Sequence, residues 1–265
     1  MLPDYHLHTS FSGDSKTPPE DQIKRAIELG MPELCTTDHH DYDVVSNTDF
    51  TLDTASYMQE MKLLQDKYQS RIPVKIGVEL GLQEHLTDYL DAYSKQYPFD
   101  FIVGSIHFVN RQDVYYPAFF EDRSLHDAYE EYLKTTLKNI KLHRCFDVLG
   151  HLDYVTRYRK PMESGDFYRD FGDLIDEILR CLIQTGRGIE CNTGGLLKNQ
   201  GQTNPGFDVL RRYHELGGEI LTIGSDGHTP ETVGWNFNQV RDRLWSCGFR
   251  FYTVFNQRET DFLLL

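Results

Sequence analysis

Hydrophobic residues occur along the chain in short runs that alternate with longer stretches of helical spacing. The short runs are rich in Val, Ile, Leu and Phe, which is typical of parallel strands that are buried on both faces of a sheet. We expect one strand in each of seven runs, at residues 5–8, 33–37, 74–80, 101–108, 146–152, 188–193 and 219–225.

The stretches between these runs are predicted to be helices. In 57–68, apolar residues recur at helical spacing and form one face. The first helix is expected to be capped by Thr17, because Glu20 follows at the spacing of a capping box, and to end at Gly30. Further helices are expected at about 84–96, 125–143, 167–185, 205–216 and 230–246.

The succession of strand–helix units predicts the architecture. Seven units follow one another without a Pro/Gly/Ser linker, so we expect a single α/β domain over 1–265. No G-x-G-x-x-G follows the first strand, which excludes the usual dinucleotide site. The number of units favours a closed barrel over an open doubly wound sheet. The tail is expected to form a strand at 249–255 and a partial helix at 256–265.

Composition and charge exclude several classes of protein. The 265 residues carry a formal net charge of −14, which disfavours binding to nucleic acid or to anionic membranes. No apolar run approaches the roughly 20 residues of a membrane span, and the N-terminus does not resemble a secretory signal. The five cysteines are scattered, as is typical of reduced thiols. We therefore expect a cytoplasmic enzyme, with its oligomeric state left open.

Histidines and carboxylates are concentrated where the predicted strands end. In a parallel barrel these ends share one face, where the βα loops build the active site. Burying so many polar groups without partners would be costly, so core packing does not explain the pattern. The residues concerned are His6, His8, Asp38, His39, His40, Glu79, His107, His151, Asp153, Asp226 and His228.

This set of residues favours a metal site. His6 and His8 lie two residues apart, so their side chains project the same way from a strand. Imidazoles combined with carboxylates suit zinc, iron or manganese better than calcium or magnesium. His39 and His40 point in opposite directions, so one is expected to bind metal while the other packs or meets substrate. The remaining histidines are predicted to be solvated: His85, His126, His143 and His214.

Six ordered motifs carry a family resemblance. Each is weak alone, but their order on successive predicted strands is highly specific. With them the chain resembles the polymerase-and-histidinol-phosphatase (PHP) superfamily, and its length and the segments 104–108 and 190–196 resemble the stand-alone histidinol-phosphatase branch. The motifs are His6-Leu-His8-Thr, Thr37-Asp38-His39, Gly77-Val-Glu79, Gly104-Ser-Ile-His107, Gly150-His151-Leu-Asp153 and Ser225-Asp226-Gly-His228.

The resemblance implies a distorted (β/α)7 TIM-like barrel that binds three divalent metal ions. It also implies hydrolysis of L-histidinol phosphate to L-histidinol and phosphate in histidine biosynthesis. By this resemblance, the first metal would bind His6, His8, Glu79 and Asp226, the second would bind Glu79, His107 and His151, and the third would bind Asp14, His39 and His228.

Charge arithmetic supports a phosphate ester as the substrate. Three divalent cations, less the charges of Asp14, Glu79 and Asp226, leave about +3, which suits a dianionic phosphomonoester. We expect a hydroxide that bridges two metals to attack phosphorus directly. The general acid is not identified by the sequence. Asp153 and His40 are candidates, although support of a metal ligand is an alternative role for either.

Basic residues after the fifth and sixth strands are candidates for binding the phosphate. Asp41 and Asp43 are candidates for the cationic amine of histidinol, and Tyr115-Tyr116-Pro117 could pack on an imidazole ring or on the barrel rim. The basic candidates are Arg157, which lies nearest the strand end, and Arg159, Lys160 and Lys198.

Two other functions stay open at this stage. One is a PHP-type phosphoesterase that acts on nucleotides or on another small phosphate ester. The other is a noncatalytic metal-binding barrel. Structural zinc sites are closed four-ligand cages that are often rich in cysteine, and this set contains none.

Overall fold

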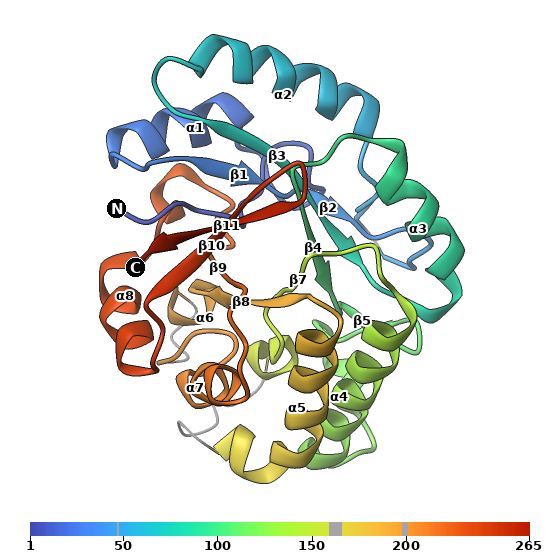
Figure 1. Ribbon diagram of the computed structural model, residues 1–265. Helices are drawn as coiled ribbons and strands as arrows, with labels where there is room; N and C mark the ends of the chain where they lie inside the picture. Colours follow the sequence, from blue (N-terminus) through green and yellow to red (C-terminus); the bar gives the residue numbers. More distant parts are fainter. Residues whose placement is uncertain (47, 159–165, 198–200) are drawn as a thin grey trace.

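A parallel sheet curls around the centre of the molecule (Figure 1). The computed structural model describes residues 1–46, 48–158, 166–197 and 201–265. Neighbouring strands of the sheet follow one another along the chain, as expected for repeated strand–helix units. Their order is β1 (Leu34–Thr36), β3 (Val74–Gly81), β4 (Phe101–Ser105), β7 (Val148–Leu149), β8 (Gly188–Asn192) and β9 (Leu221–Gly224), and β2 (His39–His40) also pairs with β3.

The N-terminal segment joins the two edges of this sheet. On the β1 side, the Cys35 backbone N–H donates to the Asp4 carbonyl at 2.8 Å. On the β9 side, the Tyr5 N–H donates to the Ile223 carbonyl at 3.0 Å. Isolated bridges rather than a continuous ladder form this closure. The prediction of a distorted TIM-like α/β barrel is confirmed, although the strand expected at 5–8 is reduced to these isolated bridges.

Helices cover the outside of the curled sheet (Figure 1). Their apolar faces pack on the strands; Ile178 and Leu182 of the helix 166–184, for example, are fully buried. Among the described residues, no helix is both long and apolar enough to cross a membrane. The helices are α1 (Pro19–Glu28), α2 (Thr54–Tyr68), α3 (Thr87–Gln96), α4 (Leu125–Leu142), α5 (Asp166–Gln184), α6 (Gly194–Leu197), α7 (Phe207–Glu215) and α8 (Phe237–Ser246).

Short elements occupy several of the connections. They include a two-stranded hairpin directly after β4 and single 3-10 turns before or between the helices. These elements are β5 (Phe108–Val109), β6 (Gln112–Asp113), η1 (Glu84–Leu86), η2 (Pro117–Phe120), η3 (Tyr154–Tyr158) and η4 (Pro230–Thr232).

The start of α1 differs from the prediction. Pro18 occupies the N-cap position and no side chain caps the helix, so the expected capping box is wrong. The Thr17 hydroxyl instead donates to the His228 carbonyl at 2.7 Å. The Glu20 carboxylate accepts a hydrogen bond from the Tyr68 hydroxyl at 2.7 Å. Thr17 thus ties the loop after β9 to the N-terminal part of the chain.

The tail forms a hairpin of β10 (Phe251–Asn256) and β11 (Glu259–Leu264), so the predicted partial helix is wrong. Gln257 and Arg258 have φ values of 50° and 66°, which form a two-residue turn of the kind that joins twisted strands. The hairpin lies across the ring of strands (Figure 1), where the Phe255 N–H donates to the Tyr5 hydroxyl at 2.9 Å. It covers the amino-terminal end of the barrel.

Candidate metal centre

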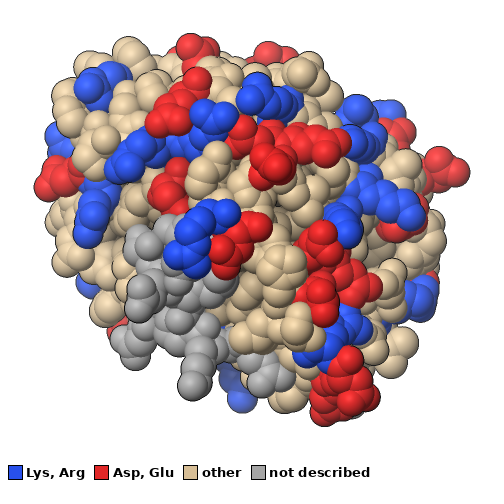
Figure 2. All heavy atoms as spheres, turned by 90° about the horizontal axis from the view of Figure 1, so that it is seen from below, with Lys and Arg blue, Asp and Glu red and all other residues tan. Residues whose placement is uncertain are grey.

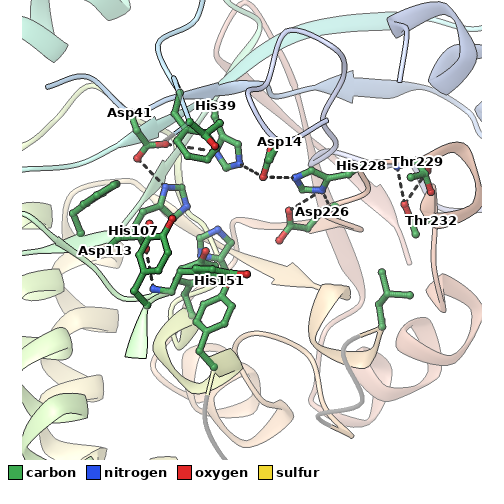
Figure 3. Close-up of a pocket in the computed structure, with 18 residues that line it drawn as sticks. Asp14, His39, Asp41, His107, Asp113, His151, Asp226, His228, Thr229 and Thr232 are labelled. Atoms are coloured by element: carbon green, nitrogen blue, oxygen red, sulfur yellow. Dashed lines mark hydrogen bonds and ion pairs between the residues drawn. The ribbon is translucent and has the colours of Figure 1, made fainter. Parts of the chain in front are cut away.

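The carboxyl ends of the strands bring nine predicted site residues together. His6 and His8 come from the N-terminal segment, His39 from β2 and Glu79 from β3. Asp14 lies in the loop before α1. The other four follow β4, β7 and β9: His107, His151, Asp226 and His228. Figure 3 shows six of the nine residues around one cavity.

Glu79 lies at the centre of the cluster and is fully buried. Its Oε1 lies 2.9 Å from His151 Nε2 and 3.3 Å from His107 Nε2. Its Oε2 lies 2.8 Å from His39 Nδ1 and 3.4 Å from His6 Nε2. His8 Nε2 also lies 3.7 Å from Oε2, so a single carboxylate faces five imidazole rings, more than its own charge can neutralise if all were protonated.

Asp226 provides a second carboxylate. Its Oδ1 lies 3.3 Å from His8 Nε2 and 3.9 Å from His6 Nε2. Its Oδ2 accepts a hydrogen bond from Arg157 at 2.6 Å. The backbone of Asp226 has a φ of 55°, a conformation that costs energy for a residue other than glycine and that is concentrated at functional sites.

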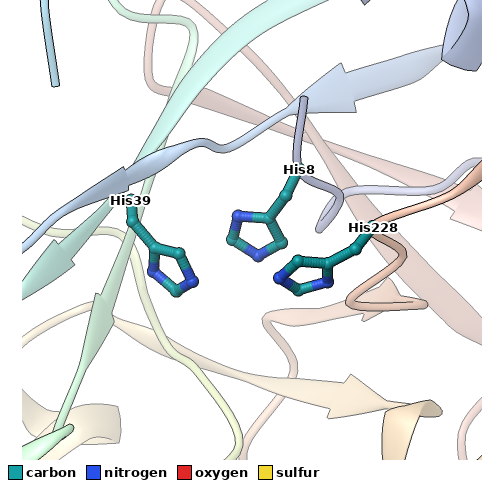
Figure 4. A group of neighbouring side chains, drawn as sticks. All are labelled: His8, His39 and His228. Carbon is teal, nitrogen blue, oxygen red and sulfur yellow. The ribbon is translucent and has the colours of Figure 1, made fainter. Parts of the chain in front are cut away.

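The third carboxylate, Asp14, lies at the more exposed side of the cluster. Its Oδ2 is 3.1 Å from His228 Nε2 and 3.7 Å from His39 Nε2. The His8 ring lies between these two imidazoles (Figure 4), with centroid distances of 4.2 Å to His39 and 4.3 Å to His228. Asp14, His39 and His228 thus form the outer edge of the cluster.

The electrostatic environment shifts the pKa values of neighbouring imidazoles in opposite directions. Burial lowers the pKa of His6, but Glu190 and Glu79 outweigh it and raise that pKa well above its ordinary value. Burial and the neighbouring rings of His39 and His228 lower the pKa of His8 to about 3. His8 is therefore neutral, which is the form of imidazole that binds a metal.

The donor atoms fit a group of cations. His6 Nε2 and His8 Nε2 are buried without a hydrogen-bond partner among the described residues. His39 Nδ1 and Glu79 Oε2 form no hydrogen bond either, because their contact at 2.8 Å lacks hydrogen-bond geometry. Such atoms are costly unless a ligand occupies the space between them. Four sets of residues hold donor atoms within 4.8 Å of one another: His6, Glu79 and His151; His6, His8 and Asp226; His39, Glu79 and His107; and His8, His39 and His228.

Polar groups behind the cluster hold the imidazole rings in place. Glu190 Oε1 lies 2.7 Å from His6 Nδ1, and Glu190 Oε2 accepts a hydrogen bond from the backbone N–H of His151 at 3.0 Å. Asp41 Oδ1 lies 2.9 Å from His107 Nδ1. Such outer partners fix the orientation of a metal-binding imidazole. The sequence analysis did not select Glu190, although a carboxylate within a buried strand was the available signal.

Asp38 supports the loop that follows the N-terminal segment. It accepts hydrogen bonds from the Thr9 backbone N–H at 2.6 Å and from the Ser12 hydroxyl at 2.8 Å. Ser12 Oγ in turn lies 2.9 Å from His8 Nδ1. Asp38 therefore acts on the cluster through Ser12.

The basic residues predicted to bind phosphate have different outcomes. Arg157 is buried and donates to Asp226, to Asn192 at 2.8 Å and to Asn204 at 2.8 Å. It does not line the cavity, which disfavours contact with the phosphate. Its hydrogen bonds favour a role in holding Asp226. The other three lie outside the described residues: Arg159, Lys160 and Lys198.

The two candidate general acids lie away from the cavity. Asp153 accepts from Asn204 Nδ2 at 2.7 Å, and burial raises its pKa to about 7. His40 accepts from the Leu52 N–H at 3.2 Å, and its Nε2 lies 2.9 Å from the Tyr89 hydroxyl. Burial lowers the pKa of His40 to about 4. Of the two roles expected for His40, packing is the one that its contacts favour.

One further prediction is wrong, and the contacts of Asp43 bear on another. His143 is buried rather than solvated, because its Nε2 pairs with the Gln83 carbonyl at 3.0 Å. Asp43, a candidate for the amine of the substrate, is exposed and pairs with Arg111 and His85.

A cavity of about 550 Å³ opens beside the cluster (Figure 3). Histidines, carboxylates and aromatic rings line it, and no lysine or arginine does so in the described parts of the chain. The aromatic lining residues are Phe50, Phe108, Tyr115, Tyr116, Tyr154 and Tyr158.

The surface charge is mixed. On the face drawn in Figure 2, acidic and basic side chains are interspersed, without a continuous basic stripe over the described residues.

Comparisons with known proteins agree on one family. The PHP domain model matches residues 4–194. A protein from Clostridium acetobutylicum named "Probable histidinol-phosphatase" is 33% identical over 94% of this chain and 95% of its own length. The "Histidinol-phosphatase" of Lactococcus lactis subsp. lactis is 30% identical over 97% of this chain and 96% of its own length.

Solved structures resemble the whole fold. The crystal structure of histidinol phosphate phosphatase from Lactococcus lactis, complexed with zinc, L-histidinol and phosphate, has a TM-score of 0.91 and 29% identity. The match covers 98% of this chain and 100% of that one. A structure from Listeria monocytogenes has a TM-score of 0.76 at 20% identity over 89% of this chain and 99% of its own, which supports the fold alone.

Proposed function

This chain belongs to the PHP domain family, and from that premise we propose that it is a metal-dependent phosphatase that hydrolyses L-histidinol phosphate to L-histidinol and phosphate. The observation that carries the proposal is the buried cluster around Glu79, in which His6 Nε2, His8 Nε2 and Glu79 Oε2 converge without hydrogen-bond partners in the described chain. The similar structure from Lactococcus lactis was determined with zinc, L-histidinol and phosphate.

Three divalent ions are the number that we propose for this cluster. Four carboxylates lie close to two or more imidazoles, and one of them, Asp41, holds the Nδ1 side of His107. The other three support this number, because each offsets part of one cation's charge. The first ion would be held by His6, His8, Glu79 and Asp226, the second by Glu79, His107 and His151, and the third by Asp14, His39 and His228.

When bound, such ions supply a hydroxide near neutral pH and stabilise the oxygens of an in-line displacement. The protein's own contribution is orientation: Glu190 holds the Nδ1 side of His6, and Asp41 holds that of His107. Arg157 holds Asp226. Direct attack on phosphorus, without a phosphoenzyme, stays a prediction. It requires inversion of configuration at phosphorus, which hydrolysis of a chiral phosphate ester tests.

The charge of the cavity supports a phosphomonoester over a neutral ester. No lysine or arginine among the described residues lines the cavity, so on the described lining the positive charge that receives the phosphate would come from the cations. The aromatic lining residues offer a surface on which the substrate's imidazole ring can pack.

The test combines elemental analysis of protein purified without chelator with a phosphate-release panel. We expect bound zinc, iron or manganese, and faster hydrolysis of L-histidinol phosphate than of nucleoside monophosphates or a dinucleotide. Chelation should abolish activity and leave the circular dichroism of the barrel largely unchanged. A preference for a nucleotide would contradict the proposed substrate, and metal-free protein with full activity would contradict the metal dependence.

A further inference from the structure

The hairpin that follows β4 adds to the cavity a carboxylate that belongs to none of the imidazole groups. Asp113 ends β6, and the β5–β6 hairpin begins directly after His107. The Val114 N–H donates to the His107 carbonyl at 3.1 Å, which fixes the end of the hairpin beside this histidine. Figure 3 shows Asp113 on the same side of the cavity as His107 and Asp41.

Asp113 differs from the other three carboxylates that line the cavity. Asp14, Asp41 and Asp226 each face a histidine or an arginine within about the distance of a hydrogen bond. Asp113 is half-buried and accepts one hydrogen bond, from the Tyr115 N–H at 2.8 Å. Within the described chain it has no ion pair, so its charge is left for a cation in the cavity.

Tyrosine rings continue this side of the cavity. Tyr115 contacts Tyr158 edge-to-face with centroids 4.9 Å apart, and Tyr158 contacts Tyr154 at 5.2 Å. The Tyr154 ring lies 4.7 Å from that of His151. Aromatic faces favour a nearby ammonium group and reduce its hydration, which strengthens its attraction to a carboxylate.

The chemistry of the substrate requires such a position. In L-histidinol phosphate the amine is bonded to the carbon next to the ester carbon, so it stays close to the phosphate. A phosphate at the metal cluster therefore places the ammonium group near the cluster but outside it. Asp41, which was a candidate for this role, is already engaged by His107 and lies 3.6 Å from His39 Nδ1. Asp113 is close to the cluster and not engaged.

We propose that Asp113 receives the protonated amine of the substrate and makes the enzyme select aminoalkyl phosphates over phosphate esters without a positive charge. This inference rests on the proposed function. It assigns the amine to a residue that the sequence did not single out.

The test compares L-histidinol phosphate with the analogue that lacks the amino group, in the wild type and in Asp113→Asn. For the natural substrate, we expect Asp113→Asn to raise KM on the order of 10- to 100-fold with little change in kcat, as when a charge-assisted hydrogen bond made throughout the reaction is removed. For the analogue, kcat/KM should be the same in both proteins. Binding of the product L-histidinol, measured by calorimetry, should weaken by a similar factor.

Asp43→Asn is the matched control, because Asp43 is an exposed carboxylate outside the cavity lining and should affect neither ester. Asp113→Glu should restore part of the preference. If Asp113→Asn slows both esters equally, or loses bound metal, the residue supports the fold or the cluster and the inference is wrong. If the wild type itself does not prefer L-histidinol phosphate to other esters, the proposed function fails, whatever Asp113 does.

Discussion

The two ends of the barrel differ in whether their buried polar atoms have hydrogen-bond partners. At the amino-terminal end, the Asp147 carboxylate accepts from Arg258 at 2.8 Å and from the Ile102 N–H at 2.8 Å. At the carboxyl end, His6 Nε2 and Glu79 Oε2 converge without a hydrogen-bond partner among the described residues. Partnered polar groups stabilise a fold, whereas converging unpartnered ones cost stability and indicate a ligand.

The same contrast occurs across one peptide bond. His40 has protein partners at both ring nitrogens, the Leu52 N–H and the Tyr89 hydroxyl, and stacks on Tyr93 with centroids 4.1 Å apart. His39 points the other way, toward Glu79. Buried imidazoles are therefore distinguished by the partners of their nitrogens rather than by burial alone.

Glu79→Gln should produce the largest effect. It removes the charge that faces five imidazoles but keeps the shape of the side chain, so we expect activity to fall on the order of 10³-fold or more. Metal content should fall as well, while circular dichroism should remain that of the wild type. A variant with full activity and full metal content would contradict the central place of Glu79.

Glu190→Gln should have a smaller effect on the same end. The substituted amide keeps the size of the side chain but holds His6 Nδ1 less strongly, and loss of such an outer partner costs roughly 10- to 100-fold in metal affinity or activity. Competition with a chelator measures the affinity, and phosphate release measures the activity. Unchanged metal retention would show that His6 does not depend on Glu190.

Arg258→Met tests the other end of the barrel. It removes the partner of the largely buried Asp147 and should lower the free energy of unfolding by about 1–3 kcal/mol. Because the pair lies at the end opposite the metal cluster, kcat/KM should stay within about twofold of the wild type. Urea unfolding measures the first quantity, and a large loss of activity in the folded variant would break the comparison between the two ends.

Much of this division could be predicted from the sequence, because strand order and a shared strand end bring residues such as His6 and Asp226 together whatever the details of packing. The features that were missed depend on tertiary partners. The turn at Gln257 and Arg258 lacks glycine, so the hairpin was not expected. From the sequence, Arg157 is a basic residue in a loop. Only the fold shows that it donates hydrogen bonds to Asp226, Asn192 and Asn204.

His143 was also misjudged, since its charged neighbours in the sequence suggested solvent, and it provides the smallest predicted effect. Burial lowers its pKa below the ordinary 6.5, so the unfolded chain binds a proton more readily than the folded one. The stability that it contributes is present above pH 6.5 and is lost as the pH falls through the pKa of the folded state. Between pH 7 and pH 5, the wild type should therefore lose more unfolding free energy than His143→Gln at equal metal loading, by less than about 1 kcal/mol. Parallel slopes for the two proteins would mean that His143 is solvated after all.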